Sequence, residues 1–268
     1  MLKRPPQDVK DHVQRRFGDV AANYRRSKVH AAGPDLDCMI AAATLSAETR
    51  VLDAGCGAGH TAAAFARDAG QVIACDFTPA MLAQSKALAR DRGLANISAQ
   101  LADVENLPFP DDCFDLIVTR YSAHHWLHPE QALAEFRRLL KTDGVLLISD
   151  IMAREDYAQD TFLQTIELLR DPSHVRDYRI SEWGDMLEGA GFGCEVLMRF
   201  DLSLHFETWT RRMNTPAQNA DMIKSLFDGA SADIKRAFRL PARATGGDFE
   251  FVIPGAVIRA TAAKTSSR

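Results

Sequence analysis

Residues 51–60 read Val-Leu-Asp-Ala-Gly-Cys-Gly-Ala-Gly-His, a short apolar run followed by an acid and three glycines at alternate positions. Glycines at this spacing permit a sharp turn and let a ligand approach main-chain atoms that a Cβ atom would shield. Such a turn, between a strand and a helix, is typical of a binding site for a nucleotide-like ligand. These sites lie at the carboxyl end of the first strand of an α/β sheet. The stretch therefore predicts both the fold class and a ligand-binding loop.

The spacing of these glycines narrows the choice of ligand. Gly59 comes one residue too early for the dinucleotide fingerprint G-x-G-x-x-G, which would need a glycine in place of His60. This spacing disfavours an NAD-binding oxidoreductase, and a P-loop is excluded because no Gly-Lys-Ser/Thr follows. The carboxylate of Asp53 would repel a pyrophosphate on the loop, whereas it suits an ammonium or sulfonium group. The alternative is a glycine-rich turn that binds no ligand.

The pattern Asp-x-Gly-x-Gly-x-Gly at residues 53–59 resembles motif I of the class I S-adenosylmethionine-dependent methyltransferases. Residues 107–115 read Leu-Pro-Phe-Pro-Asp-Asp-Cys-Phe-Asp, which is similar to the LPFxDxxFD segment of the ubiquinone/menaquinone methyltransferase-like group, methyltransferase type 11. The resemblance spans at least residues 50–150. It implies a Rossmann-like fold with S-adenosylmethionine as the cofactor and leaves the substrate open.

The composition is that of an ordinary globular chain. The 268 residues, 46% hydrophobic and 25% charged, fit one large domain or a domain with a modest cap. A formal net charge of -4 gives no general attraction to nucleic acid or anionic membranes. The sequence contains no pattern of a secretory signal or a membrane span. Five scattered cysteines without a C-x-x-C pair predict neither a zinc site nor a disulfide framework, so we expect a cytoplasmic protein without a metal.

Apolar periodicity predicts two amino-terminal helices followed by alternating strands and helices. Strands are expected at residues 50–53, 71–76, 97–102, 114–119 and 145–149, with helices at 60–69, 79–92 and 130–141 between them. This alternation indicates a doubly wound, mostly parallel α/β sheet. Strands at 194–204 and 249–260 bring the sheet to seven. A further helix is expected to begin at an N-cap Ser181.

The chain order also predicts a lid. We expect residues 1–45 to form an amino-terminal helical cap segment and residues 46–268 to form the methyltransferase domain. Strands five and six should run parallel to the first, so helical insertions at about 155–180 and 205–243 leave from the ligand side of the sheet. In the second insertion Trp209, Arg211 and Arg212 either meet an aromatic or acidic substrate or form the lid's own packing.

Acidic residues follow the next two predicted strands. Asp76, about twenty residues after the glycines, can accept two hydrogen bonds from ribose hydroxyls or else cap a helix. The resemblance implies that Asp103 accepts from the adenine amino group, and that Tyr24, in an AxxYxxS helix, closes over the methionine end of the cofactor unless it is only packed there. The residues expected at the cofactor are Tyr24, Asp53, Ala54, Gly55, Gly57, Gly59, Asp76, Phe77, Met81, Asp103, Val104 and Arg120.

Residues 119–126, at the end of the fourth strand, read Thr-Arg-Tyr-Ser-Ala-His-His-Trp. Amino-directed nucleic acid methyltransferases carry Asn/Asp-Pro-Pro-Tyr/Phe here, so this comparison disfavours methylation of DNA or RNA bases. A histidine can act as proton acceptor because imidazole titrates near neutrality. Neighbouring side chains diverge in extended backbone, so we expect one histidine to face the ligand and slightly favour His124 over His125, with Tyr24 as a partner when the lid shuts. The alternatives are a histidine that ties the loop together, and an Arg120 that either closes over the cofactor or holds the loop.

These observations predict an S-adenosylmethionine-dependent methyltransferase that acts on oxygen or carbon of a small, partly apolar molecule, such as a quinone-like or natural-product acceptor. The alternative is a protein that binds S-adenosylmethionine but does not transfer its methyl group. It would be a binding protein, or an enzyme that uses the bound sulfonium in another way. We expect a small-molecule substrate, no nucleic acid partner, no membrane span, and a monomer or homodimer.

Overall fold

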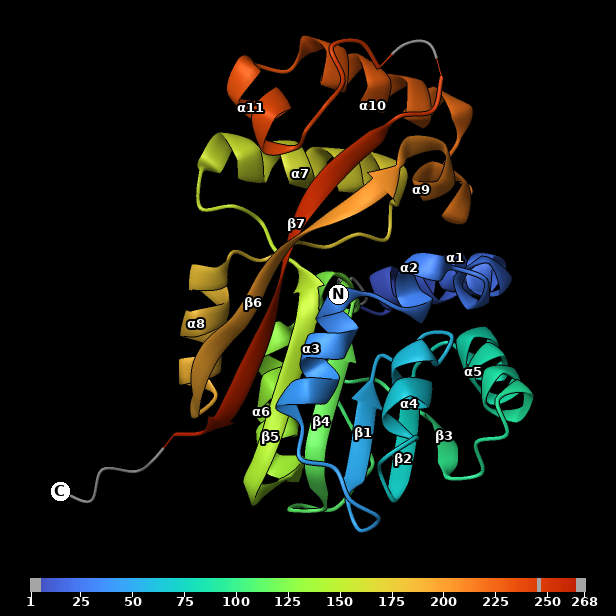
Figure 1. Ribbon diagram of the computed structural model, residues 1–268, viewed down its shortest axis with the longest axis vertical. Coiled ribbons are helices and arrows are strands. Elements are labelled where there is room, and N and C mark those ends of the chain that lie inside the picture. The colour runs from blue at the N-terminus through green and yellow to red at the C-terminus, as the bar shows by residue number, and fades with distance from the viewer. Residues whose placement is uncertain (1–5, 245–246, 264–268) are drawn as a thin grey trace, which may run out of the picture.

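The computed structural model describes residues 6–244 and 247–263, with side chains from residue 9 onward. The described chain forms a seven-stranded sheet in the order β3-β2-β1-β4-β5-β7-β6 (Figure 1). Strands β1 to β5 pair in parallel, and β7 is antiparallel to both β5 and β6, which confirms the predicted doubly wound, mostly parallel sheet. The strands are β1 (Arg50–Ala54), β2 (Gln71–Asp76), β3 (Ile97–Leu101), β4 (Phe114–Arg120), β5 (Leu140–Ile151), β6 (Phe192–His205) and β7 (Glu250–Ala262).

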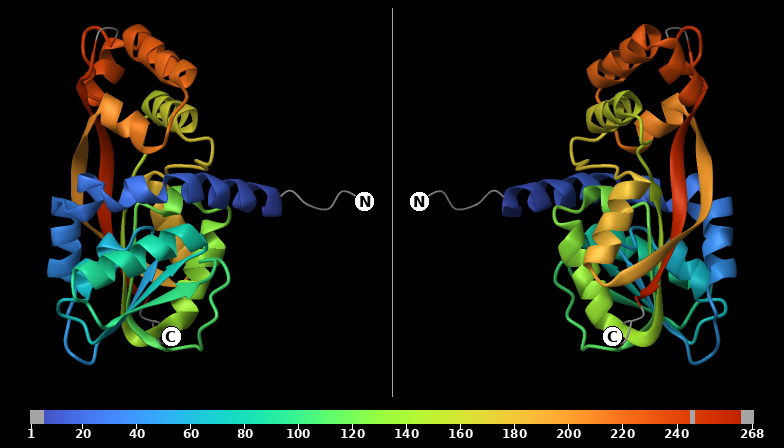
Figure 2. Two further views of the ribbon diagram at one scale, coloured as in Figure 1. Left: turned by 90° about the vertical axis from the view of Figure 1, so that its right-hand side faces the viewer. Right: turned by 90° about the vertical axis from the view of Figure 1, so that its left-hand side faces the viewer.

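Helices flank both faces of the sheet and cover its carboxyl-terminal end (Figures 1 and 2). Proline opens α3, α5 and α6, where its fixed φ favours the first helical turn and its missing N–H costs nothing. No helix in residues 6–244 or 247–263 has the length and apolar character needed to cross a bilayer. The helices are α1 (Pro6–Arg25), α2 (Lys28–Ala31), α3 (Pro34–Ala42), α4 (His60–Phe65), α5 (Pro79–Asp91), α6 (Pro129–Leu139), α7 (Tyr157–Arg170), α8 (Ile180–Gly189), α9 (Phe206–Arg212), α10 (Ala217–Gly229) and α11 (Ala232–Ala237).

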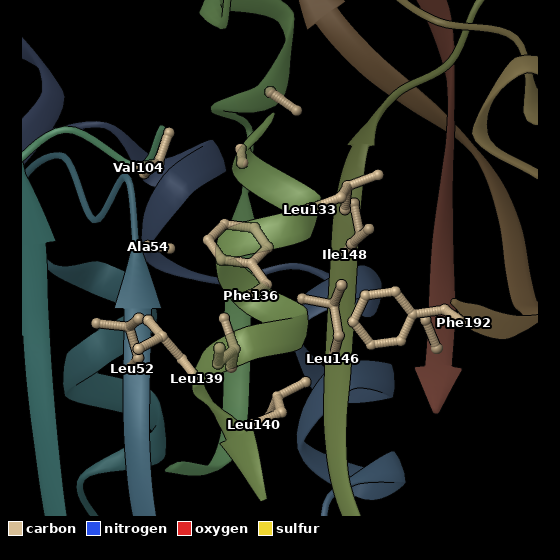
Figure 3. Packing of buried hydrophobic residues seen from close by; sticks show 14 of the residues in the cluster. Leu52, Ala54, Val104, Leu133, Phe136, Leu139, Leu140, Leu146, Ile148 and Phe192 are labelled. Carbon is tan, nitrogen blue, oxygen red and sulfur yellow. The ribbon is translucent and has the colours of Figure 1, made fainter. Parts of the chain in front are cut away.

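Strand residues alternate between two apolar layers. Leu52 of β1 belongs to the layer shared with α6 and α8, whereas its neighbour Val51 packs with α3 and α4 on the other face. Figure 3 shows the first layer, with Phe136 of α6 lying over the sheet between Leu52 and Leu146. Because successive side chains of a strand point to opposite faces, a parallel strand covered on both sides needs apolar residues at consecutive positions. The apolar run at the start of the glycine stretch meets this need.

A third apolar cluster lies beyond the carboxyl ends of the parallel strands. Here β6 and β7 continue past the sheet and carry α9, α10 and α11, against which α7 packs (Figure 1). Trp209, Phe227 and Phe251 are fully buried in this cluster. We call α7, α9, α10 and α11 the cap. Its two chain segments coincide with the insertions that the sequence places on the ligand side.

Several boundaries differ from the sequence prediction. The helix after β1 ends at Phe65 because residues 66–68 form turns, and the predicted helix at 130–141 gives way to β5 at Leu140. Ser181 does not cap α8, which begins one residue earlier. The Ser181 hydroxyl donates to Glu155 at 2.7 Å, and the carboxylate of Glu182 accepts from the Arg179 N–H at 2.8 Å. Glu182, at the third helical position, thus makes the half of a capping box that accepts from the N-cap N–H, and the Ser181 side chain is engaged outside the helix.

Candidate active site

The glycine loop turns tightly between β1 and α4. Gly59 has φ +87°, and a Cβ atom there would lie 2.3 Å from the Ser85 hydroxyl oxygen, so helix packing requires a glycine at this position. Gly57 has φ +50° and open space where a Cβ would stand. It borders a cavity, so its backbone is accessible to a ligand.

Asp53 lies beneath this loop and not in the cavity. Its side chain is buried, and Oδ2 accepts a hydrogen bond of 2.8 Å from the Ala62 N–H in the first turn of α4. Burial raises the pKa of Asp53 to about 7. The sequence predicts that Asp53 contacts the cofactor directly. In the structure its carboxylate instead binds the backbone at the start of α4 and does not border the cavity. Ala54 and Gly59 are likewise absent from the cavity wall and support the loop from within.

We call the space above the loop the first cavity; it comprises about 940 Å³ of empty space, counted with its opening to solvent. It lies at the carboxyl ends of β1, β2 and β4, where ligands bind in open α/β sheets. Helix α1 crosses over it and contributes Lys10, Val13, Phe17 and Tyr24 to its wall (Figure 2). The predicted cofactor residues that line it are Tyr24, Gly55, Gly57, Asp76, Phe77, Met81, Asp103, Val104 and Arg120.

Asp76 holds the two sides of the first cavity together. Its Oδ2 accepts from the Gly57 N–H at 2.9 Å and its Oδ1 accepts from the Thr78 N–H at 2.8 Å, at the start of α5. Burial raises the pKa of Asp76. Each carboxylate oxygen can accept a second hydrogen bond, so the same group both fixes the loop and faces the cavity as a ribose acceptor. The two roles weighed for Asp76 are therefore compatible.

Two residues that were not predicted from the sequence, Lys10 and Glu105, lie beside Asp103. The ammonium of Lys10 on α1 lies 2.5 Å from Oδ2 of Asp103 and 2.5 Å from Oε2 of Glu105. Glu105 is buried, and its other oxygen accepts from the Leu127 N–H at 2.9 Å. The signal for Glu105 is its position two residues after Asp103, whereas Lys10 is one of many cations in a basic amino-terminal segment.

Arg120 ties the amino-terminal segment to the sheet. Its Nε lies 2.5 Å from Oδ2 of Asp35 and its Nη2 3.1 Å from Oδ1, a bidentate pair in which both side chains are buried. Arg120 also donates to the backbone carbonyls of Val29 and His30. Of the two roles considered for Arg120, the structure favours holding the segment, although the side chain still borders the first cavity.

The two consecutive histidines lie in a 3-10 turn at residues 123–125, which brings their ring centroids to 4.3 Å from each other and does not let the side chains diverge as extended backbone would. His125 borders the first cavity, with its ring edge-on to Phe17 at 4.7 Å between centroids. Its Nδ1 lies 3.0 Å from the Ser173 carbonyl oxygen and must donate to it, which leaves Nε2 as the acceptor of the neutral ring. Burial and the nearby His124 lower the pKa of His125 to about 4. His125 is therefore a neutral acceptor at pH 7.

His124 points away from the first cavity. Its Nδ1 lies 2.7 Å from Oδ1 of Asp150, whose other oxygen accepts from the N–H groups of Ser122 and Ala123. Burial alone would lower the pKa of His124, but the charge and hydrogen bond of Asp150 raise it to about 9. The structure thus places His125, and not the slightly favoured His124, against the first cavity. Asp150, at the end of β5, was not singled out from the sequence.

A second cavity lies between the sheet and the cap, and comprises about 450 Å³ counted with its openings. Tyr24, His30 and Tyr121 belong to the walls of both cavities. The Tyr24 hydroxyl lies 3.0 Å from Sδ of Met213, and the ring is edge-on to that of His30 at 4.9 Å. The remaining wall is formed by apolar side chains of β5 to β7, by Val29 and Trp209, and by the polar residues His124, Glu167, Arg170, Asp177 and Arg212.

Comparisons with known proteins agree with this architecture. Residues 52–148 match the family model described as a methyltransferase domain. The chain is 37% identical over 243 residues to the uncharacterized methyltransferase YcgJ of Bacillus subtilis, covering 91% of this chain and 96% of the relative. The crystal structure of the Bacillus subtilis YcgJ protein aligns with a TM-score of 0.82 at 35% identity, over 86% of this chain and 98% of that one. A ubiquinone/menaquinone biosynthesis C-methyltransferase of Paraburkholderia phytofirmans matches over 53% of this chain and 61% of its own length, at 34% identity.

The chain belongs to the class I S-adenosylmethionine-dependent methyltransferases. Within that class it belongs to the family of the YcgJ methyltransferase, whose length it matches almost throughout. The lining of the first cavity fits the cofactor of this class because it combines a carboxylate, an accessible glycine backbone and apolar side chains, which suit ribose hydroxyls, the adjoining chain and an adenine ring. Asp76 and Gly57 would hold the ribose and the adjoining chain, and Phe77 and Met81 the adenosine.

Proposed function

We propose that this protein transfers the methyl group of S-adenosylmethionine to oxygen or carbon of a small, partly apolar molecule. The observation that carries the proposal is the pair of cavities that share Tyr24, His30 and Tyr121. A cofactor in the first cavity and an acceptor in the second would meet at these three side chains. Leu202, Leu204 and other apolar residues of the second cavity support a partly apolar acceptor, such as a quinone-like molecule or a natural product.

The bound cofactor supplies an activated methyl group, so the protein mainly has to align the reactants and keep water out. Helix α1 covers the first cavity and the cap covers the second, which supports the exclusion of water. His125 borders the first cavity and His124 the second. The base for a hydroxyl or carbon acid held in the second cavity is therefore either His125, reached at Nε2 past the shared side chains because Nδ1 is engaged by the Ser173 carbonyl, or His124 once its ring has lost its proton. Tyr24 and His30 would orient the reacting end between the two cavities.

The experiment that tests the transfer uses the full chain with S-adenosylmethionine labelled in its methyl group and the small-molecule fraction of a bacterial extract. We expect labelled product from the wild type and none from Gly57→Val, in which a side chain would occupy the open space beside the loop. Gly93→Val is the control, because Gly93 also has a positive φ (+65°) and open space at its Cβ position but lies outside the cavity wall. Tight binding of S-adenosylhomocysteine without labelled product from any fraction would favour the alternative, a protein that uses the cofactor without methyl transfer.

A further inference from the structure

The second cavity contains buried cations whose partners can be compared one by one. Arg170 lies 3.0 Å from Oε2 of Glu167, donates to the Trp209 carbonyl at 3.2 Å and stacks over the Trp209 ring at 5.0 Å. The imidazole of His124 is paired with Asp150. Each of these charges is therefore balanced by a carboxylate.

Arg212 differs from these cations. It extends from the last turn of α9, and within the described chain no carboxylate lies within 4 Å of its guanidinium. Its Nη1 donates to the Ser27 hydroxyl at 3.3 Å, whereas its Nε is buried without a hydrogen-bond partner. Burial and the neighbouring Arg170 lower the pKa of Arg212 to about 10, so the side chain is still charged at neutral pH. The cavity thus holds a cation that the protein itself does not satisfy.

Asp177, the other acidic residue in the wall of this cavity besides Glu167, does not supply a negative charge to balance Arg212. Asp177 is buried, and its Oδ2 lies 3.8 Å from Nε2 of His174, whose pKa burial lowers so that the ring is neutral. Burial raises the pKa of Asp177 well above its usual range, which favours the uncharged acid. Asp177 and Arg212 are not within ion-pair distance of each other among the described residues, although both border the same space.

We propose that the second cavity recognises a carboxylate on the methyl acceptor, which accepts hydrogen bonds from the unpaired guanidinium of Arg212. A carboxylate can accept two parallel N–H bonds from one edge of a guanidinium, and this geometry is favoured over a single contact. The apolar wall formed by Ile151, Leu204 and Ile253 would hold the body of the molecule. The acceptor class is therefore a small apolar acid. This proposal rests on the proposed function for its identification of the ligand as an acceptor.

The unpartnered buried Nε of Arg212 supports a role for this residue in binding. A buried polar group without a partner lowers the stability of a fold, because its hydrogen bonds to water are lost and not replaced. Such a group in a native structure calls for an explanation, and a ligand that accepts its hydrogen bonds would supply one.

Binding of matched small probes tests the proposal in the presence of saturating S-adenosylhomocysteine. Calorimetry would compare benzoate with benzamide, which has nearly the same shape without the charge, and with phenyl phosphate. We expect benzoate to bind at least tenfold more tightly than benzamide to the wild type, and Arg212→Gln to remove this preference. Arg211→Gln, at the neighbouring exposed position, should keep it.

Three results would overturn the proposal: equal binding of benzoate and benzamide, no binding of either, or a preference for benzoate that survives Arg212→Gln. Stronger binding of phenyl phosphate would replace the carboxylate by a phosphate and so also contradict it. Binding of S-adenosylhomocysteine to every variant shows that the fold and the first cavity are intact. The probe affinities are measured without turnover, so they stand or fall independently of the labelled-product experiment.

A second measurement needs no knowledge of the acceptor. Arg212→Met removes an unsatisfied buried cation and should leave Tm unchanged or raise it in the ligand-free protein. Benzoate should raise Tm of the wild type and not that of Arg212→Met. A clear loss of Tm in ligand-free Arg212→Met would indicate a structural role for this arginine and contradict the proposal.

Discussion

At the scale of single residues, the site is organised by which polar groups are satisfied and which are left open. Asp76 and Asp150 are fixed by backbone N–H groups, so their remaining lone pairs are directed at defined places. His124 and His125 are adjacent in sequence, yet Asp150 raises the pKa of one and burial lowers that of the other. Opposite pKa shifts in neighbouring groups separate an acid from a base.

The neutral state of His125 gives a prediction for activity. If its Nε2 accepts the proton, His125→Gln should lower kcat by about 100-fold or more, since general base catalysis contributes about that much. The affinity for S-adenosylhomocysteine should change little. Because the pKa of His125 is lowered to about 4, wild-type turnover should be flat near neutrality and fall only toward that pH. Turnover that instead rises with pH up to about 9 would point to His124 as the base.

The pairing of His124 with Asp150 gives a prediction for stability. The pKa of His124 is raised from its ordinary value of 6.5 to about 9, so the protonated ring stabilises the folded state. This contribution is fully present below pH 6.5 and is lost as the pH rises through about 9. Urea unfolding at several pH values should show this decrease in the wild type and a flatter profile in His124→Gln. Parallel profiles for the two proteins would refute the charged pair.

At the scale of elements, α1 is the part of the molecule that covers the first cavity. It packs on α5 and is fastened by the ammonium of Lys10 to Asp103 and Glu105. Its Gln14 side chain donates to the Phe77 carbonyl at 2.5 Å. A helix attached by polar contacts at an exposed edge can open locally at a lower free energy than the sheet beneath it. We therefore expect α1 to be the element that opens when the cofactor enters.

Loss of the Lys10 contacts should loosen α1. Lys10→Met is expected to increase hydrogen exchange of the α1 amides several-fold, while the amides of β1 and β4 keep their protection. The matched control is Lys28→Met, at an exposed lysine for which the described chain provides no ion pair. Hydrogen exchange followed by mass spectrometry measures both. Equal exchange in Lys10→Met and the wild type would show that packing on α5, and not Lys10, holds the helix.

At the scale of the whole molecule, the cap and the sheet are joined by continuous strands. β6 and β7 pair over thirteen register positions, from beside α8 up to α9, so the cap core and the sheet core share the same backbone (Figure 1). The antiparallel pairing of β7 with β5 extends to Ile151, which itself belongs to the cap cluster. Because shared strands couple the two cores, we expect them to unfold together.

A core substitution in the cap tests this coupling. Phe227→Ala should lower the free energy of unfolding by about 3–5 kcal/mol, as for other buried phenylalanines, and should do so within a single calorimetric transition. Leu226→Ala, the adjacent residue with 37% of its surface exposed, should change it far less. Two separate transitions in Phe227→Ala, with only one shifted, would show that the cap unfolds by itself.

Most of the sheet could be predicted from local patterns. The glycine stretch, the apolar strands and the acids after β2 and β3 lie close to one another in sequence, and each pattern reports a short-range requirement such as a turn, a buried strand or a strand end. Asp76 and Asp103 were found in this way and border the first cavity. The N-cap expected at Ser181 was wrong because the helix begins one residue earlier, where Glu182 accepts from the Arg179 N–H, and Ser181 instead donates to Glu155, a residue 26 positions away in the sequence.

The sequence by itself determined the fold class through its periodicity, and the cofactor through the resemblance of its glycine stretch to motif I, because both are patterns of neighbouring residues. Only the tertiary structure decided which histidine faces the first cavity, that Lys10 reaches Asp103 across 93 positions, and that Arg212 has no carboxylate partner within the described chain. These features depend on contacts between segments far apart in the chain. The glycine stretch carries no information on them, since the direction and pairing of a side chain are set by what packs around it.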